Sequence, residues 1–81
     1  MRVAVKLFAA GRELAGAAEC VLELPDTATV ADVRRGLVEQ CATLATLAPR
    51  SLVAVNAEYA DDATELTAGD EVALIPPVSG G

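Results

Sequence analysis

Two glycines, Gly80 and Gly81, end the sequence directly after a strand-like segment that two prolines close. Because glycine has no side chain, such a tail fits a narrow channel and brings its α-carboxylate to a distant active site. That carboxylate is ionised at neutral pH and must be activated, for instance as an acyl-adenylate, before a sulfur or nitrogen nucleophile attacks it. The stretch from Pro76 to Gly81 reaches roughly 20 Å when extended, at 3.3–3.6 Å per residue. We therefore predict that Gly81 is the reacting group, with Val78, Ser79 and Gly80 as the part of the tail that is inserted.

Gly-Gly alone is a weak signal, because frayed chain ends and remnants of expression tags have the same composition. The composition of the rest of the chain excludes several kinds of catalytic and metal site. The chain has no histidine, which excludes Ser-His-Asp and Cys-His catalysis and histidine-containing zinc sites. No glycine-rich loop is present to hold phosphates, so a partner must bind the ATP that activation uses, and we expect this chain to bind no cofactor itself.

Two cysteines, Cys20 and Cys41, are too few for a four-cysteine zinc or iron–sulfur site. A disulfide between them is one interpretation, although a reducing cytoplasm disfavours it. The pattern favours two small buried hydrophobic residues, since Cys20 alternates in phase with Leu22 and Leu24 and Cys41 falls on an apolar helical stripe.

Length and composition indicate one small aliphatic domain. The chain has 81 residues, of which 53% are hydrophobic and only two, Phe8 and Tyr59, are aromatic. This length predicts a single domain, 1–81, with no large internal cavity. The net charge of −6 argues against nucleic acid and fits a basic partner. No apolar stretch is long enough for a membrane span or a signal peptide, so we expect a soluble, cytoplasmic protein.

Hydrophobic periodicity predicts six elements. Alternation predicts strands, and a spacing of three and four residues predicts one amphipathic helix that begins at a Thr29–Asp32 capping box. The segment from Gly11 to Gly16 is typical of a turn, and Ala42–Ala48 is either a continuation of the helix or a loop that Pro49 ends. The expected strands are 2–9, 18–24, 52–55, 58–60 and 71–75, and the expected helix runs from about residue 30 to the early forties.

This order predicts a two-layer α+β fold of the β-grasp kind: a mixed sheet of four to five strands with one main helix on one face. The first and last strands would lie parallel at the centre, and 76–81 would form an extended tail. Strand parity then turns Phe8 and Ile75 to the face away from the helix, and Tyr59, on a short strand of the same sheet, would join them. Together they would form an exposed apolar patch typical of a protein-binding surface. For Phe8 the alternative is an edge of the core, or cover by the 11–16 segment.

At this point the sequence resembles, over essentially its whole length, the small subunit of molybdopterin synthase, the MoaD-like, ubiquitin-like sulfur carriers. The run from Leu66 to Gly81, at the end of the sequence, is the most specific part of this resemblance. The resemblance depends on Val5-Lys6-Leu7-Phe8-Ala9 with Arg12-Glu13-Leu14, on Thr29-Val30-Ala31-Asp32-Val33-Arg34, on Ala54-Val55-Asn56-Ala57-Glu58-Tyr59, and on the run from Leu66-Thr67-Ala68-Gly69-Asp70-Glu71 to Pro76-Pro77-Val78-Ser79-Gly80-Gly81.

The resemblance implies a sulfur-carrier function. An adenylyltransferase related to ubiquitin-activating enzymes would attach AMP to Gly81, and a sulfur donor would convert the adenylate to a thiocarboxylate. The carrier would then dock on the large synthase subunit, in a heterotetramer, and give its sulfur to the cyclic pyranopterin precursor of the molybdopterin dithiolene. Phe8, Tyr59 and Ile75 match family positions that contact the partner, although an aromatic residue is common where Ile75 stands. The catalytic side chains would belong to the large subunit, so this chain is a carrier rather than a free-standing enzyme.

Three other functions remain open. The same tail chemistry with a lysine nucleophile would make the chain a protein modifier. A sulfur carrier for thiamine or cysteine synthesis would share the fold and the Gly-Gly end. A non-catalytic β-grasp binding module would tolerate the loss of Gly80 and Gly81.

Overall fold

A computed structural model describes residues 1–77 of the chain. Val78, Ser79, Gly80 and Gly81, which the sequence analysis assigns to the reactive tail, lie outside the described residues. Within residues 1–77, no helix is long and apolar enough to cross a membrane. The elements, in chain order, are β1 (Arg2–Leu7), α1 (Ala9–Ala15), β2 (Glu19–Glu23), α2 (Val30–Gln40), the 3-10 helices η1 (Ala42–Leu44) and η2 (Ala48–Arg50), β3 (Leu52–Val55), β4 (Glu58–Ala60) and β5 (Val72–Ile75).

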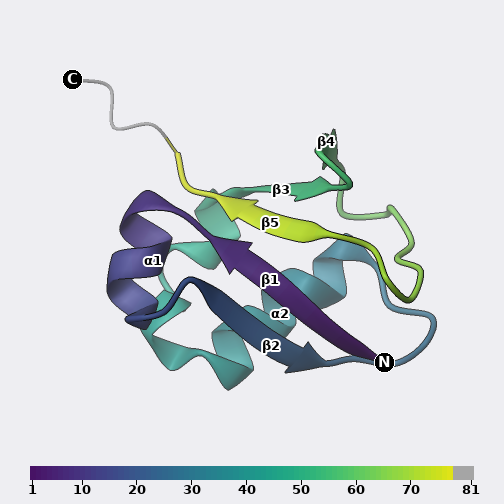
Figure 1. Ribbon diagram of the computed structural model, residues 1–81, viewed down its shortest axis with the longest axis horizontal. Helices are drawn as coiled ribbons and strands as arrows, with labels where there is room; N and C mark the ends of the chain where they lie inside the picture. The colour runs from purple at the N-terminus through teal and green to yellow at the C-terminus, as the bar shows by residue number, and fades with distance from the viewer. Residues whose placement is uncertain (78–81) are drawn as a thin grey trace.

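The five strands form one mixed sheet in the order β2-β1-β5-β3-β4 (Figure 1). The central pair β1 and β5 is parallel, with Val5 beside Val72 and Leu7 beside Leu74. The pairs β1–β2, β3–β5 and β3–β4 are antiparallel. This topology confirms the predicted β-grasp fold, including the parallel placement of the first and last strands.

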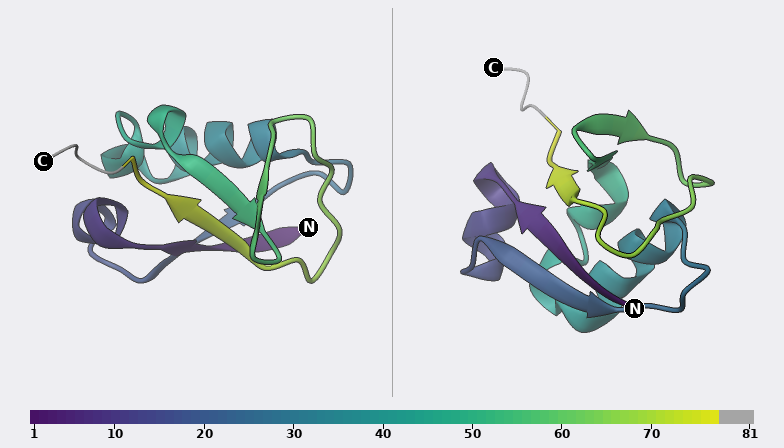
Figure 2. Two further views of the ribbon diagram at one scale, coloured as in Figure 1. Left: turned by 90° about the horizontal axis from the view of Figure 1, so that it is seen from above. Right: turned by 45° about the vertical axis from the view of Figure 1, so that its right-hand side comes forward.

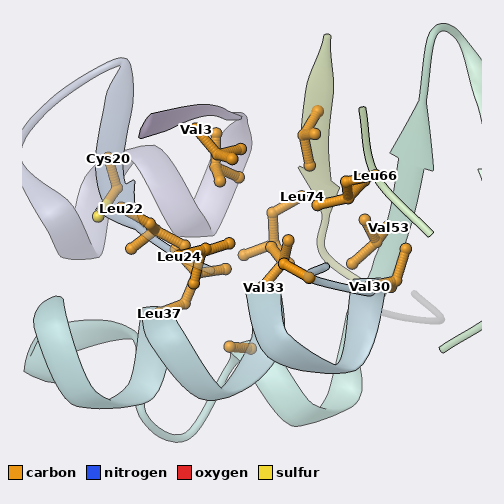
Figure 3. Packing of buried hydrophobic residues seen from close by; sticks show 14 of the residues in the cluster. Val3, Cys20, Leu22, Leu24, Val30, Val33, Leu37, Val53, Leu66 and Leu74 are labelled. Carbon is orange, nitrogen blue, oxygen red and sulfur yellow. The ribbon is translucent and has the colours of Figure 1, made fainter. Parts of the chain in front are cut away.

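Helix α2, together with η1 and η2, covers one face of the sheet, α1 lies at the end of β1, and the opposite face is left open (Figure 2). Strict alternation in β1 buries Val3, Val5 and Leu7 and exposes the residues between them. Helix α2 contributes Val30, Val33 and Leu37 to the same core, which Figure 3 shows packed against side chains from the sheet. The core is aliphatic throughout, as the composition predicts, because both aromatic residues are exposed.

The predicted capping box begins α2. The Asp32 carboxylate accepts a hydrogen bond from the backbone N–H of Thr29 at 2.9 Å. This bond satisfies a donor that the first helical turn cannot satisfy itself, and it lowers the pKa of Asp32 below its ordinary value. The helix therefore starts at Val30, as the sequence predicts.

The sequence prediction was wrong for the segment after the first strand. Residues 9–15 form the helix α1 rather than a turn, and the first strand ends at Leu7 rather than at residue 9. Gly16, with a φ of 67°, ends α1 in the left-handed conformation that favours glycine. Tertiary packing supports this short helix, because α1 packs against η1 and its buried Gly11 lies close to Leu47 and Leu74.

The segment after α2 was also only partly predicted. It forms η1 and η2, so the main helix stops at Gln40 and does not continue to Pro49. Pro49 does not end an element; it occupies the first turn of η2, where a missing N–H costs no hydrogen bond. Ser51, directly after η2, is buried and donates its hydroxyl to the carbonyl of Leu47 at 2.8 Å.

The two cysteines form a disulfide, which corrects the favoured interpretation of two unlinked hydrophobic residues. Cys20 is buried on β2 in phase with Leu22, as the alternation predicts. Cys41 caps the C-terminal end of α2. The two cysteines are 21 positions apart in the sequence, and they come together only after α2 packs against β2.

Candidate functional site

The candidate site lies on the open face of the sheet, the face turned away from α2. Cross-strand register places the outward residues in rows. One row runs through Lys6 on β1, Ala73 on β5 and Ala54 on β3 to Tyr59 on β4. A neighbouring row pairs Ile75 on β5 with Leu52 on β3. Because all these positions share one parity, they form a continuous surface.

The structure brings together the three residues that the sequence predicts for an exposed apolar patch. Phe8, Tyr59 and Ile75 all border one shallow hollow on the open face, with a volume of about 380 Å³. Phe8 is 48% exposed and Tyr59 is 71% exposed. The hollow is lined by Lys6, Phe8, Ala54, Ala57, Tyr59, Glu71, Ala73 and Ile75. Exposed aromatic side chains around an apolar hollow are typical of a protein-binding surface.

Leu52 is a fourth apolar residue of this face that the sequence reasoning missed. It is 54% exposed and is the direct antiparallel partner of Ile75. Strand parity in the sequence could have identified Leu52, because it precedes Val53, and Val53 is fully buried on the opposite face. We call Phe8, Leu52, Tyr59 and Ile75 the docking patch.

Phe8 reaches the patch because the chain changes direction there. It follows the last residue of β1 and is the N-cap of α1, with the extended φ and ψ of −133° and 156°. Leu7, the residue before Phe8, still makes a backbone hydrogen bond to the segment before β2: its N–H donates to the carbonyl of Ala18 at 2.8 Å. The helix α1 leaves Phe8 half exposed, so neither burial at the core edge nor cover by residues 11–16 describes it.

A tight hairpin places Tyr59. Asn56 and Ala57 connect β3 to β4 with φ angles of 52° and 69°, the left-handed pair of a two-residue hairpin turn. The Asn56 side chain ties this hairpin to the start of β5. Its Oδ1 accepts the N–H of Glu71 at 3.0 Å, and its Nδ2 donates to Asp70 Oδ1 at 3.0 Å. Tyr59 therefore projects from a hairpin that side-chain hydrogen bonds fix to the central strands.

Charged groups flank the patch. Lys6 donates a hydrogen bond to Glu71 across β1 and β5 within the hollow. This pairing raises the pKa of Lys6 and lowers the pKa of Glu71. The pKa of Asp70 is also lowered, first because its carboxylate accepts the Thr67 N–H at 2.7 Å and second because it accepts from Asn56.

The charge of the chain is divided unevenly along the sequence. Residues 1–50 hold six acidic and six basic residues, whereas residues 51–81 hold six acidic residues and no Lys or Arg. The whole net charge of −6 therefore belongs to the part of the chain that forms β3, β4, β5 and their connections. The docking patch lies partly on these strands, next to an excess of negative charge.

Comparison with known proteins assigns the chain to a family. The ThiS family profile matches residues 5–81. The chain belongs to the ThiS family. A Molybdopterin synthase sulfur carrier subunit from Chlamydomonas reinhardtii is 39% identical over 83 residues, covering 100% of both chains.

Solved structures of similar proteins share the fold of this ThiS-family chain. SAMP1 from Haloferax volcanii, a small archaeal modifier protein, has a TM-score of 0.87 at 35% identity and covers 100% of both chains. A putative molybdopterin converting factor, subunit 1, from Pyrococcus furiosus has a TM-score of 0.83 at 32% identity and covers 96% of this chain and 99% of that one. These comparisons confirm the resemblance to MoaD-like sulfur carriers.

Proposed function

We propose that this ThiS-family chain is the sulfur carrier subunit of molybdopterin synthase. The α-carboxylate of Gly81 is adenylated, converted to a thiocarboxylate, and donates its sulfur to the cyclic pyranopterin precursor to form the dithiolene. The full-length similarity to the Chlamydomonas reinhardtii sulfur carrier subunit supports this proposal. The fold supports it as well, because the same arrangement occurs in the Pyrococcus furiosus converting-factor subunit.

One observation carries the proposal: the docking patch is continuous with the strand that leads into the tail. Ile75 is the last residue of β5 and belongs to the patch. Pro76 follows it directly and lies close to Gly11 of α1. A partner that covers the patch therefore also receives the chain at the point where residues 76–81 begin.

We assign the chemical steps to partner proteins, because this chain has no histidine and no glycine-rich phosphate-binding loop. Activation of a carboxylate consumes ATP and releases pyrophosphate, and a sulfur nucleophile then displaces AMP from the acyl-adenylate. Two partners, an adenylyltransferase related to ubiquitin-activating enzymes and a sulfur donor, would supply these steps. The large subunit of molybdopterin synthase would bind the docking patch and supply the catalytic side chains, in a heterotetramer.

The first test is the intact mass of the full chain after incubation with ATP, the adenylyltransferase and a sulfur donor. We expect one terminal oxygen to be replaced by sulfur, and fragmentation to place the change on Gly81. A variant lacking Gly81 is the control, and it should gain no sulfur. An unmodified chain, with the adenylyltransferase shown to be active on another carrier, would contradict the proposal.

The second test addresses docking on the large subunit. Phe8→Glu puts a charge where the patch is apolar and half exposed, so it should weaken binding and leave the fold intact. Calorimetry measures the binding, and circular dichroism checks the fold. Unchanged affinity in a folded variant would show that the large subunit does not use this face.

A second candidate function is protein modification. The 35% identity to SAMP1 over the whole chain favours it, because that protein is described as a modifier. The same activated Gly81 would then be attacked by a lysine amine to form an isopeptide. Lys6 is the only lysine of this chain and is paired with Glu71, so the acceptor would be another protein. Isopeptide-linked conjugates of the wild-type chain, absent for the variant lacking Gly81, would establish this function.

A further inference from the structure

The hollow that the docking patch borders contains one ion pair among apolar residues. Lys6 and Glu71 line the same hollow as Phe8, Tyr59 and Ile75, and the remaining lining residues are alanines. Their side chains are 46% and 59% exposed, so both charges still contact water in the free chain. A partner that covers the hollow removes this water.

Covering the pair with an apolar surface would be unfavourable, because a desolvated ion pair needs its remaining hydrogen-bonding capacity satisfied. Lys6 uses one of its three ammonium donors for Glu71. Among residues 1–77, Glu71 accepts from Lys6 through Oε1, and its Oε2 accepts no hydrogen bond. The partner must therefore present polar or charged groups at this point of an otherwise apolar contact.

The local charge decides the sign of the partner's group. Glu19 is the direct cross-strand neighbour of Lys6 on the same face, so a carboxylate lies on either side of the ammonium. Arg12 lines the hollow that contains Glu19 but not the hollow that contains Glu71. The negative excess of residues 51–77 adds to the same field, since β3, β4 and β5 carry no basic residue. A cation on the partner gains from this arrangement, whereas an anion would be repelled.

We propose that Glu71, held by Lys6, is the polar specificity element of the hollow beside the docking patch and receives an arginine or lysine of the large synthase subunit. An arginine fits best, because its planar guanidinium can bond Oε2 of Glu71 and still lie flat against the neighbouring apolar side chains. The surrounding apolar residues exclude water from this contact and strengthen it. This inference rests on the proposed function, which names the large subunit as the partner.

The test compares variants of the full chain for binding to the large subunit from the same organism, by calorimetry at low and high salt. Glu71→Gln should weaken binding about tenfold and reduce its salt dependence. The swapped double variant, Lys6→Glu with Glu71→Lys, keeps an internal ion pair but reverses its orientation, and it should bind at least tenfold more weakly.

The chain offers a matched control on the same face. Arg2 and Glu23 form an exposed ion pair at 3.1 Å outside the lining of the hollow. Glu23→Gln should bind like wild type, and thermal melting should show all variants folded. Wild-type affinity and salt dependence in Glu71→Gln and in the swapped variant would overturn the inference and leave the proposed function standing. Failure of the wild-type chain itself to bind the large subunit would overturn both.

Discussion

Leu52 on β3 and Ile75 on β5 are direct antiparallel partners on the open face of the sheet. Ile75 leads into Pro76, so this pair stands where the described part of the tail leaves the sheet. Leu52 continues the apolar surface from Ile75 onto the next strand and is 54% exposed. The pair therefore links the docking patch to the segment that we propose carries sulfur.

Replacing Leu52 with Glu should weaken binding to the large synthase subunit by tenfold or more, because it puts a charge beside Ile75 in the apolar contact. The fold should be retained, since the side chain faces solvent. Val21→Glu is the matched control: Val21 is 51% exposed on β2, outside the hollow. Equal losses in the two variants, measured by calorimetry, would show that the effect does not come from the docking patch.

Gly36 should be intolerant of large side chains although it lies in the middle of α2. A Cβ at this position would lie 3.1 Å from Leu22 Cδ1 and 3.3 Å from Leu24 Cδ2. Gly36→Val should therefore destabilise the fold by about 1–3 kcal/mol, measured by urea denaturation. Gly36→Ala should cost less, because about 1 kcal/mol of improved helix propensity offsets the crowding. A Gly36→Val variant as stable as wild type would show that α2 packs less closely on β2.

Reducing the Cys20–Cys41 disulfide should lower the free energy of unfolding by about 3 kcal/mol, the loop-entropy value for a closed loop of this size. The loop spans a sequence separation of 21 residues. The measurement is the denaturation midpoint with and without a thiol reductant. The double variant Cys20→Ser with Cys41→Ser is the control, and reductant should not affect it. Two titratable thiols in the untreated chain would contradict the disulfide.

Acid should destabilise the fold through carboxylates that accept hydrogen bonds. The pKa values of Asp32, Asp70 and Glu71 lie below their ordinary values of 3.8, 3.8 and 4.5. As the pH falls, the unfolded chain therefore binds protons at these groups before the folded chain does. The stability that these groups contribute is fully present only above their ordinary pKa values. It is lost as the pH falls from about 4.5 through the lower folded-state values.

Asp70 offers the cleanest check of this acid dependence, because its carboxylate accepts from both Thr67 and Asn56. Asp70→Asn should be less stable than wild type at neutral pH and should lose less stability on acidification. Urea midpoints between about pH 2 and pH 7 measure both effects. Parallel pH profiles for the two proteins would show that Asp70 does not contribute.

On the alkaline side, the raised pKa of Lys6 predicts a stability contribution that is present below pH 10.5 and lost as the pH rises through the folded-state value.

The sequence alone predicted the features that depend on local periodicity and capping. Alternation in residues 2–7 determined which side of β1 is buried, and the Thr29–Asp32 pair determined where α2 begins. The same parity placed Phe8 and Ile75 on one face, and the structure gathers them with Tyr59 around one hollow. The role of Gly81 lies beyond the described residues and remains a prediction.

Only the tertiary structure decided the features that depend on contacts between distant segments. The short helix α1 packs against η1, and its buried Gly11 lies near Leu47 and Leu74, all of which are distant from it in the sequence. The disulfide joins Cys20 and Cys41 because α2 lies across β2, and Leu52 joins the docking patch because β3 pairs with β5 in a particular register. Local propensity contains no information on such pairings, because their energy comes from surfaces that meet only in the folded chain.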